Sequence, residues 1–153
     1  MAALASEGKV YGVDHSRRAV GAATKLNERL VRDGRIEIVE GSVSHLPFAN
    51  GMFDVVTAVE THFWWPDLMG DMREVFRVVK PGGMIVVIAE VYAAAKARTS
   101  QLAEKYAKKS GMKMLSVDEH REMLESAGFR NVEITTDSGR GWICCTGRKP
   151  EVD

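Results

Sequence analysis

The feature that most constrains the fold is an apolar run, a helical pattern and a second apolar run in succession. Residues 54–59 are almost continuously apolar, as a strand covered on both faces should be, and residues 84–89 are a second near-apolar run that predicts a strand. Pro66 can open a helix between them, and Pro81-Gly82-Gly83 is a strong turn signal before the second run. The apolar positions of that helix are Leu68, Met72, Val75, Phe76 and Val79. This order predicts parallel strands joined by a crossover helix.

The residues before this segment show the same alternation. Residues 9–13 are typical of a short strand that ends at Asp14, and residues 36–40 are typical of the next strand. Between them, Ser16 can cap a helix with apolar residues at helical spacing, and Gly34 fits its end.

The C-terminal third adds helices and a hairpin. Residues 93–109 predict a helix that Gly111 interrupts, and residues 116–119 form a capping box for a helix through Ser126. Two short strands, 132–136 and 142–146, are joined by Ser-Gly-Arg-Gly, which predicts an antiparallel hairpin. The whole chain therefore predicts a single α/β domain over residues 1–153. Its sheet is doubly wound and mostly parallel, with a C-terminal antiparallel hairpin strand.

Composition narrows the partners and the compartment. The chain has 153 residues and a formal net charge of zero, so nothing favours nucleic acid or an acidic membrane surface. The longest apolar run is too short to span a bilayer, and the first residues lack the basic region of a signal peptide. Cys144 and Cys145 are neighbours, whose side chains point to opposite faces of a strand, so we expect two reduced thiols in a cytoplasmic protein.

Three motifs occur in a specific order. Leu46-Pro47-Phe48 precedes Phe53-Asp54, Val79-Lys80-Pro81-Gly82-Gly83 precedes an apolar run, and Ala127-Gly128-Phe129 precedes another strand. This order resembles the class I S-adenosylmethionine-dependent methyltransferases, and within them the small-molecule branch called type 11. The resemblance implies a Rossmann-like fold and S-adenosylmethionine as cofactor. It also implies transfer of a methyl group to a small-molecule acceptor, in which the cofactor supplies the reactivity.

Asp14 is the first candidate site residue. Nucleotide-binding α/β folds place an acidic residue at the end of a strand, where its two oxygens accept hydrogen bonds from the ribose hydroxyls. Asp14 and its neighbour His15 are therefore candidate cofactor-binding residues. The alternative is an exposed aspartate that assists the following helix N-terminus.

By resemblance, the segment after the strand at residues 36–40 contacts the adenine. The family often has an acidic residue there, whereas this chain has Ser42, an uncharged and weaker acceptor. Backbone groups of Val43 could still bind the adenine edge. The alternative is a loop that only closes the edge of the sheet.

A third group of candidates follows the strand at residues 54–59, on the rim where doubly wound sheets bind ligands. Glu60 is a candidate for both cofactor binding and catalysis, and His62 is a candidate general base, although a lone histidine is often structural. Phe63, Trp64 and Trp65 follow, and three consecutive aromatics cannot all face one core. At least one of them should be exposed or line a pocket.

The resemblance also implies a first strand and a glycine-rich turn before residue 9, and residues 2–7 resemble only the tail of the helix that follows them. We therefore expect a chain that is N-terminally truncated relative to the family. Its partner would be a complementing N-terminal segment or a second copy in a homodimer, because open strand edges recruit other strands. The alternative function is a non-catalytic binding or interaction protein that retains the fold.

Overall fold

The computed structural model describes residue 5 and residues 7–151. The helix tail expected over residues 2–7 lies largely outside the described residues. The chain forms two compact units, Met1–Pro47 and Phe48–Asp153. Each unit is described by itself below, and the single domain expected over residues 1–153 stays a prediction.

The first unit is a two-stranded parallel sheet with two helices. Strand β1 (Val10–Asp14) pairs with β2 (Ile36–Glu40) in the register Val10↔Ile36 to Asp14↔Glu40. The connection contains α1 (Arg17–Leu26) and α2 (Glu28–Arg32). Ser16 caps α1 as expected, because its hydroxyl oxygen accepts from the Ala19 N–H.

The single helix expected between Ser16 and Gly34 is wrong. Asn27 divides it: the backbone N–H and the side-chain amide of Asn27 both donate to the Ala23 carbonyl oxygen. An asparagine side chain that bonds to nearby backbone competes with the helix and so ends α1. The chain then starts a second, five-residue helix.

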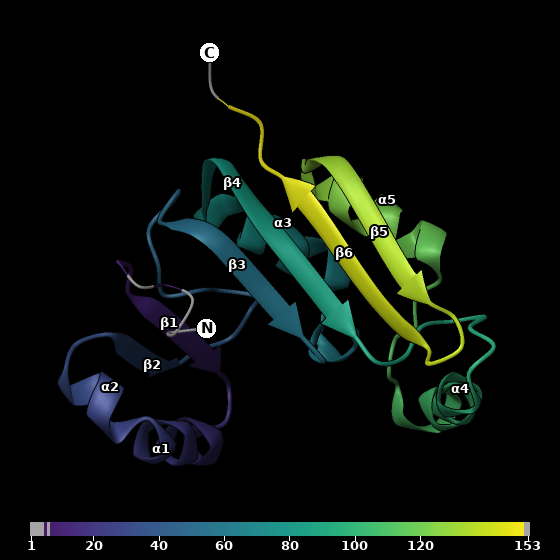
Figure 1. The fold of residues 1–153 in the computed structure, drawn as a ribbon, viewed down its shortest axis with the longest axis horizontal. Helices are drawn as coiled ribbons and strands as arrows, with labels where there is room; N and C mark the ends of the chain where they lie inside the picture. Colours follow the sequence, from purple (N-terminus) through teal and green to yellow (C-terminus); the bar gives the residue numbers. More distant parts are fainter. Residues whose placement is uncertain (1–4, 6, 152–153) are drawn as a thin grey trace. The chain divides into compact units, whose positions relative to one another are not determined.

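The second unit is built on a four-stranded sheet in the order β3-β4-β6-β5 (Figure 1). The strands are β3 (Phe53–Val59), β4 (Val79–Ala89), β5 (Arg130–Asp137) and β6 (Trp142–Arg148). β3 and β4 are parallel, whereas β6 is antiparallel to both β4 and β5. The α/β class and the antiparallel hairpin are thus confirmed. The expectation of a mostly parallel sheet is wrong for the described residues: β1–β2 and β3–β4 are parallel, whereas β4–β6 and β5–β6 are antiparallel, because the hairpin supplies two of the four strands of the larger sheet.

Pro81-Gly82-Gly83 does not form the separate turn that we expected. These residues lie within β4, and the pairing with β3 shifts there, from Phe53↔Val79 to Val55↔Met84. Gly82 has a positive φ of 74°, and its N–H donates to the Lys149 carbonyl oxygen at 2.9 Å. The turn signal therefore produces an irregularity inside a long strand, which the chain after β6 holds by hydrogen bonds.

Two helices cover one face of this sheet (Figure 1). They are α3 (Leu68–Val78) and α5 (Val117–Ala127). Asp67, not Pro66, caps α3, since its carboxylate accepts from the Gly70 N–H. The capping box at α5 is confirmed. The largest fully buried apolar side chains of this layer are Met72, Ile85, Met123, Leu124, Phe129 and Ile143.

The other face of the sheet retains exposed apolar side chains. Val55 and Val59 of β3 are 46% and 50% exposed, and Ile88 of β4 is 39% exposed. We expected the strand at residues 54–59 to be covered on both faces, and this expectation is wrong for the described residues. A continuous apolar run indicates hydrophobic side chains on both faces, but not what covers the second face.

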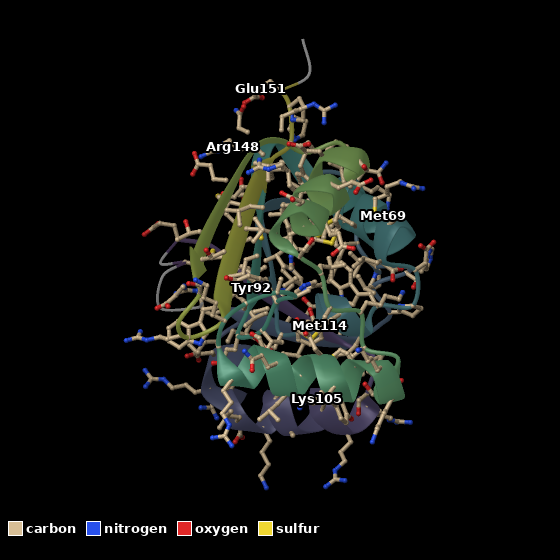
Figure 2. The ribbon with its side chains drawn as sticks, turned by 90° about the vertical axis from the view of Figure 1, so that its right-hand side faces the viewer. Met69, Tyr92, Lys105, Met114, Arg148 and Glu151 are labelled. Carbon is tan, nitrogen blue, oxygen red and sulfur yellow. The ribbon has the colours of Figure 1, made fainter. Side chains whose placement is uncertain are left out.

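Helix α4 (Arg98–Ser110) is shorter than expected. The predicted start at residue 93 is wrong, because Ala94 has a φ of 64° and its N–H donates to the Glu104 carboxylate instead of a helical carbonyl. Gly111 ends α4 in the left-handed conformation, as expected. Figure 2 shows Lys105 of α4 at the opposite end of this unit from Arg148 and Glu151.

Candidate functional site

Asp14 lies at the carboxyl end of β1, beside the carboxyl end of β2. Its carbonyl oxygen accepts from the Gly41 N–H at 3.0 Å, which continues the parallel pairing past the ends of both strands. Its Oδ1 accepts from the Ser16 N–H at 2.8 Å, so the carboxylate is held at the N-terminus of α1. The two segments predicted to bind the adenosine are therefore neighbours within one unit.

The Asp14 carboxylate suits a vicinal diol. Its side chain is 47% exposed, and Oδ2 has no hydrogen bond within the described part of the chain. His15 is 90% exposed, with Nδ1 at 3.7 Å from Asp14 Oδ1. One carboxylate oxygen thus orients the group and the other is available to a ligand hydroxyl. The bond from Ser16 to Oδ1 is the helix-assisting alternative, and it leaves Oδ2 able to bind a ribose hydroxyl.

Ser42 and Val43 follow at the end of β2. The Ser42 hydroxyl oxygen accepts from the Ser44 N–H at 3.2 Å, and the Ser42 carbonyl oxygen accepts from the His45 N–H at 3.1 Å. The Ser42 hydroxyl hydrogen is left as a donor. The backbone N–H and carbonyl of Val43 make no hydrogen bonds among the described residues, so they can serve the edge of a planar heterocycle.

Gly41 sits at a close approach of backbone and side chains. A Cβ added there would lie 3.2 Å from both Val13 Cγ1 and Pro47 Cδ. A side chain at this position would therefore need Val13 and Pro47 to move by a few tenths of an ångström, so space and not the φ angle favours glycine here.

In the second unit, Glu60 links the carboxyl ends of two strands. Its N–H donates to the Ile88 carbonyl oxygen, and its carboxylate accepts from the Glu90 N–H at the end of β4. Glu60 has a φ of 56°, which is uncommon for a residue other than glycine. Strained residues of this kind cluster at functional sites, where surrounding contacts hold them in place.

His62 opens the short 3₁₀ turn η1 (His62–Trp64) after Glu60. Its side chain is 1% exposed, and its Nε2 lies 3.0 Å from Nε2 of His120, which is equally buried in α5. Burial, with a smaller effect of neighbouring His120, lowers the pKa of His62 to about 3. Burial likewise lowers the pKa of His120, although its hydrogen bond to Ser116 opposes this.

This geometry favours the structural alternative for His62. A general base must reach the proton that it removes, whereas His62 is enclosed and one ring nitrogen is paired with His120. The role of general base therefore stays a prediction. His120 itself was not predicted, since its partner lies 58 residues earlier in the chain.

The aromatic residues of the turn divide as expected. Phe63 and Trp65 are 5% and 9% exposed, whereas Trp64 is 51% exposed. Lys113, which precedes α5, anchors the turn: its N–H donates to the Phe63 carbonyl oxygen at 2.9 Å. Its ammonium donates to the carbonyl oxygens of Trp65 and Pro66 at 2.9 and 2.7 Å. Trp64 is thus presented to solvent from a turn that is fixed on both sides.

A shallow basic depression of about 300 Å³ lies at the other end of the second unit, where Figure 2 shows Arg148 and Glu151. Its arginines are already engaged: Arg148 donates to the Gly82 carbonyl oxygen, and Arg130 donates to those of Glu125 and Phe129. It lies at the amino end of the β4 segment that pairs with β3, so it is separate from the Glu60 rim.

Both cysteines are free thiols. Burial raises the pKa of Cys145 to about 12, so this thiol is not a nucleophile near neutral pH. No helix within the described residues combines the length and the apolar character needed to cross a membrane.

The predicted site residues therefore form two groups. Asp14, His15, Ser42 and Val43 come together at one edge of the first unit. Glu60 and His62 lie at the end of β3 in the second unit.

Comparison with known proteins gives a consistent result. A family model described as "Methyltransferase domain" matches residues 1–87. Demethylmenaquinone methyltransferase of Lactococcus lactis is 42% identical over 82 residues, which are 53% of this chain and 32% of that protein. The enzyme of the same name from Bacillus mycoides is 27% identical over 157 residues, covering 86% of this chain and 64% of that protein.

Among solved structures, a phosphoethanolamine N-methyltransferase of Haemonchus contortus in complex with phosphomonomethylethanolamine and S-adenosylhomocysteine aligns with a TM-score of 0.79. The alignment covers 94% of this chain and 44% of that chain at 15% identity, so it shows the fold, which is Rossmann-like. The chain thus spans about one third to two thirds of the length of the two curated relatives named above.

Proposed function

The chain belongs to the class I S-adenosylmethionine-dependent methyltransferase family, and we propose that it transfers a methyl group from S-adenosylmethionine to a small-molecule acceptor. The observation that carries this proposal is the edge of the first unit. Within the described residues, Asp14 Oδ2 and the backbone groups of Val43 have no hydrogen-bond partner, and both residues lie just past the paired ends of β1 and β2. An adenosine group requires a hydrogen-bond acceptor for its two ribose hydroxyls and, nearby, backbone groups that can bond to the edge of its adenine ring.

In this proposal the first unit binds and orients the adenosine half of the cofactor. Asp14 accepts from the ribose hydroxyls, with His15 beside it, while Ser42 and Val43 contact the adenine. The cofactor, when bound, supplies an activated methyl group on a sulfonium. The protein contributes position and exclusion of water. Glu60 holds the ends of β3 and β4 together on the rim where doubly wound sheets bind ligands.

We assign the acceptor to the turn that carries Trp64. An indole that is half exposed on an anchored turn offers a flat apolar surface at little cost in conformational entropy. A planar or apolar ring is the acceptor chemistry that such a surface suits. The similarity to demethylmenaquinone methyltransferases supports an acceptor of this kind. We place the reaction in the cytoplasm, in keeping with the free thiols.

A methyl-transfer assay tests this proposal. Labelled S-adenosylmethionine is supplied with a short-chain demethylmenaquinol, and product is measured for the parent, Trp64→Ala and Trp142→Ala. Trp142 is the matched control, because it is 47% exposed but lies on β6. We expect Trp64→Ala to raise the KM for the acceptor roughly tenfold, with Trp142→Ala unchanged.

Equal effects of the two substitutions would remove the acceptor assignment. Cofactor binding without transfer to any acceptor would instead favour the non-catalytic binding protein.

A further inference from the structure

The pair formed by His62 and His120 has a determined pattern of protons. His120 Nδ1 lies 2.7 Å from the Ser116 carbonyl oxygen, which can only accept, so Nδ1 carries a hydrogen. Neutral His120 then has a bare Nε2. Because this Nε2 lies 3.0 Å from Nε2 of His62, the hydrogen between them belongs to His62.

This pattern leaves His62 Nδ1 as a bare acceptor. Nδ1 is buried and has no hydrogen-bond partner in the part of the chain that the structure describes. A buried polar atom without a partner costs free energy, and it persists only where the surrounding contacts outweigh that cost. Here the pair joins the turn η1 to α5, and the Lys113 contacts join the same turn to the segment before α5.

Adding a proton to either ring of the pair costs free energy, for a different reason at each site. A proton on His120 Nε2 would set two N–H groups against each other across 3.0 Å. A proton on His62 Nδ1 would leave the hydrogen bond to His120 in place, but it would bury a cation whose new N–H has no acceptor among the described residues. The contact between the turn and α5 is therefore most stable while both imidazoles are neutral.

The charged groups of the neighbouring elements are engaged elsewhere. Glu119, next to His120 in α5, accepts from the Ser116 N–H at 2.7 Å. Asp71, buried in α3, accepts from the Asp67 N–H at 3.1 Å. Lys113 donates to backbone carbonyl oxygens of the turn, and Glu60 accepts from Glu90. Among the described residues none of these carboxylates is hydrogen-bonded to either imidazole. The negative charge of Glu119 favours a cationic His120, but burial outweighs it and the pKa of His120 is lowered.

We propose that His120 is a positioning residue for methyl transfer: through the neutral hydrogen bond with His62 it holds the Trp64 turn in its acceptor-binding form, and one proton on the pair releases the turn. The release is a proton-driven loss of acceptor binding in mild acid. The link to the acceptor rests on the proposed function. The proton pattern and the release do not.

Nitrogen NMR of the imidazoles tests the proton pattern directly. At about pH 7.5 we expect His62 to carry its hydrogen on Nε2 and His120 on Nδ1, with both rings neutral. The opposite tautomers, or a cationic ring in the folded chain with the turn unchanged, would overturn the proposal.

Hydrogen exchange tests the release. The Lys113 amide, which donates to the turn, should exchange roughly tenfold faster at about pH 5.5 than at about pH 7.5, after correction for the intrinsic rate. His120→Gln supplies a carbonyl oxygen that accepts from His62 and does not titrate, so the acid response should shrink. His120→Leu should loosen the turn at both pH values. His45→Gln, an exposed histidine of the first unit, is the control. An acid response equal in the parent and in His120→Gln would overturn the proposal.

The methyl-transfer assay adds a functional measurement. His120→Leu should raise the KM for the acceptor while S-adenosylhomocysteine affinity stays the same, and His120→Gln should restore the KM near pH 7.5. Absence of all turnover, with the expected NMR and exchange results, would reject the proposed function but not the positioning of the turn. An unchanged acceptor KM in an active His120→Leu variant would reject the positioning role.

Discussion

The buried histidines make the stability of the chain depend on pH. In the unfolded state a histidine titrates near its ordinary pKa of 6.5, whereas His62 in the folded state has a pKa of about 3. The unfolded state therefore binds more protons below about pH 6.5, and the free energy of unfolding falls as the pH falls from there towards 3. His62 alone should cost about 2 kcal/mol at about pH 5.

Urea unfolding at about pH 7 and about pH 5 measures this effect. His62→Phe should reduce the difference between the two pH values by about 2 kcal/mol. His15→Asn changes a histidine that is 90% exposed and should leave the difference unchanged. An equal loss of stability in the parent and in His62→Phe would show that His62 is not buried in its neutral form.

Individual residues differed in how far the sequence could predict them. The role of Asp14 could be predicted from the sequence, because nucleotide-binding α/β folds place an acidic residue at the end of a strand to bind the ribose. His120 was not, since its partner lies on an element 58 residues away and nothing in a capping-box helix marks one inward position as polar. The exposed Trp64 was predictable only as one of three aromatics.

At the scale of elements, two glycines that end helices allow a matched comparison. Gly111 after α4 and Gly128 after α5 both have positive φ, at 77° and 113°. A Cβ at Gly111 would meet nothing within 4 Å, whereas one at Gly128 would lie 2.9 Å from Phe76 Cζ. Gly111→Ala should therefore cost about 1 kcal/mol from the backbone alone. Gly128→Ala should cost roughly a further 1–3 kcal/mol from the clash.

Chemical denaturation of the two variants checks this difference. Phe76 packs edge-on against Phe129, with ring centroids 5.0 Å apart, so its ring cannot move away without disturbing the core. Equal losses in Gly111→Ala and Gly128→Ala would mean that the C-terminal turn of α5 does not pack on Phe76.

Elements with strong local signals were predictable, and those set by tertiary contacts were not. The capping box at Ser116 and the strand over residues 36–40 were located correctly. The start of α4 was not, because the Glu104 carboxylate captures the Ala94 N–H and stops an alanine-rich pattern from being helical. Similarly, pairing with the Lys149 segment draws Gly82 into β4.

At the scale of the whole molecule, strands at the edges of the two described sheets predict self-association. β1 and β3 each lie at the edge of a sheet, and β3 also exposes Val55 and Val59. Edge strands with apolar side chains recruit other strands. Because the net charge of the chain is zero, two copies do not repel each other through their net charge. We therefore expect light scattering to show a dimer that dissociates on dilution.

Two lysine substitutions test whether the dimer forms through the β3 edge or through exposed apolar side chains in general. Val55→Lys should weaken the dimer roughly tenfold, because a charge on an edge strand blocks pairing. Leu26→Lys changes a residue of α1 that is 86% exposed and should have no such effect. A parent chain that is monomeric at all concentrations would reject the homodimer.

The central claim is that the first unit binds the adenosine half of S-adenosylmethionine through Asp14, and calorimetric titration with S-adenosylhomocysteine tests it most directly. Asp14→Asn removes the carboxylate charge, whereas Asp33→Asn removes the charge of an aspartate after α2 that is 51% exposed. We predict that the parent and Asp33→Asn bind alike. Asp14→Asn should lose roughly 1.5–3 kcal/mol of binding free energy, the contribution of a charge-assisted hydrogen bond. Equal affinity in all three chains, or no binding by the parent, would contradict the account.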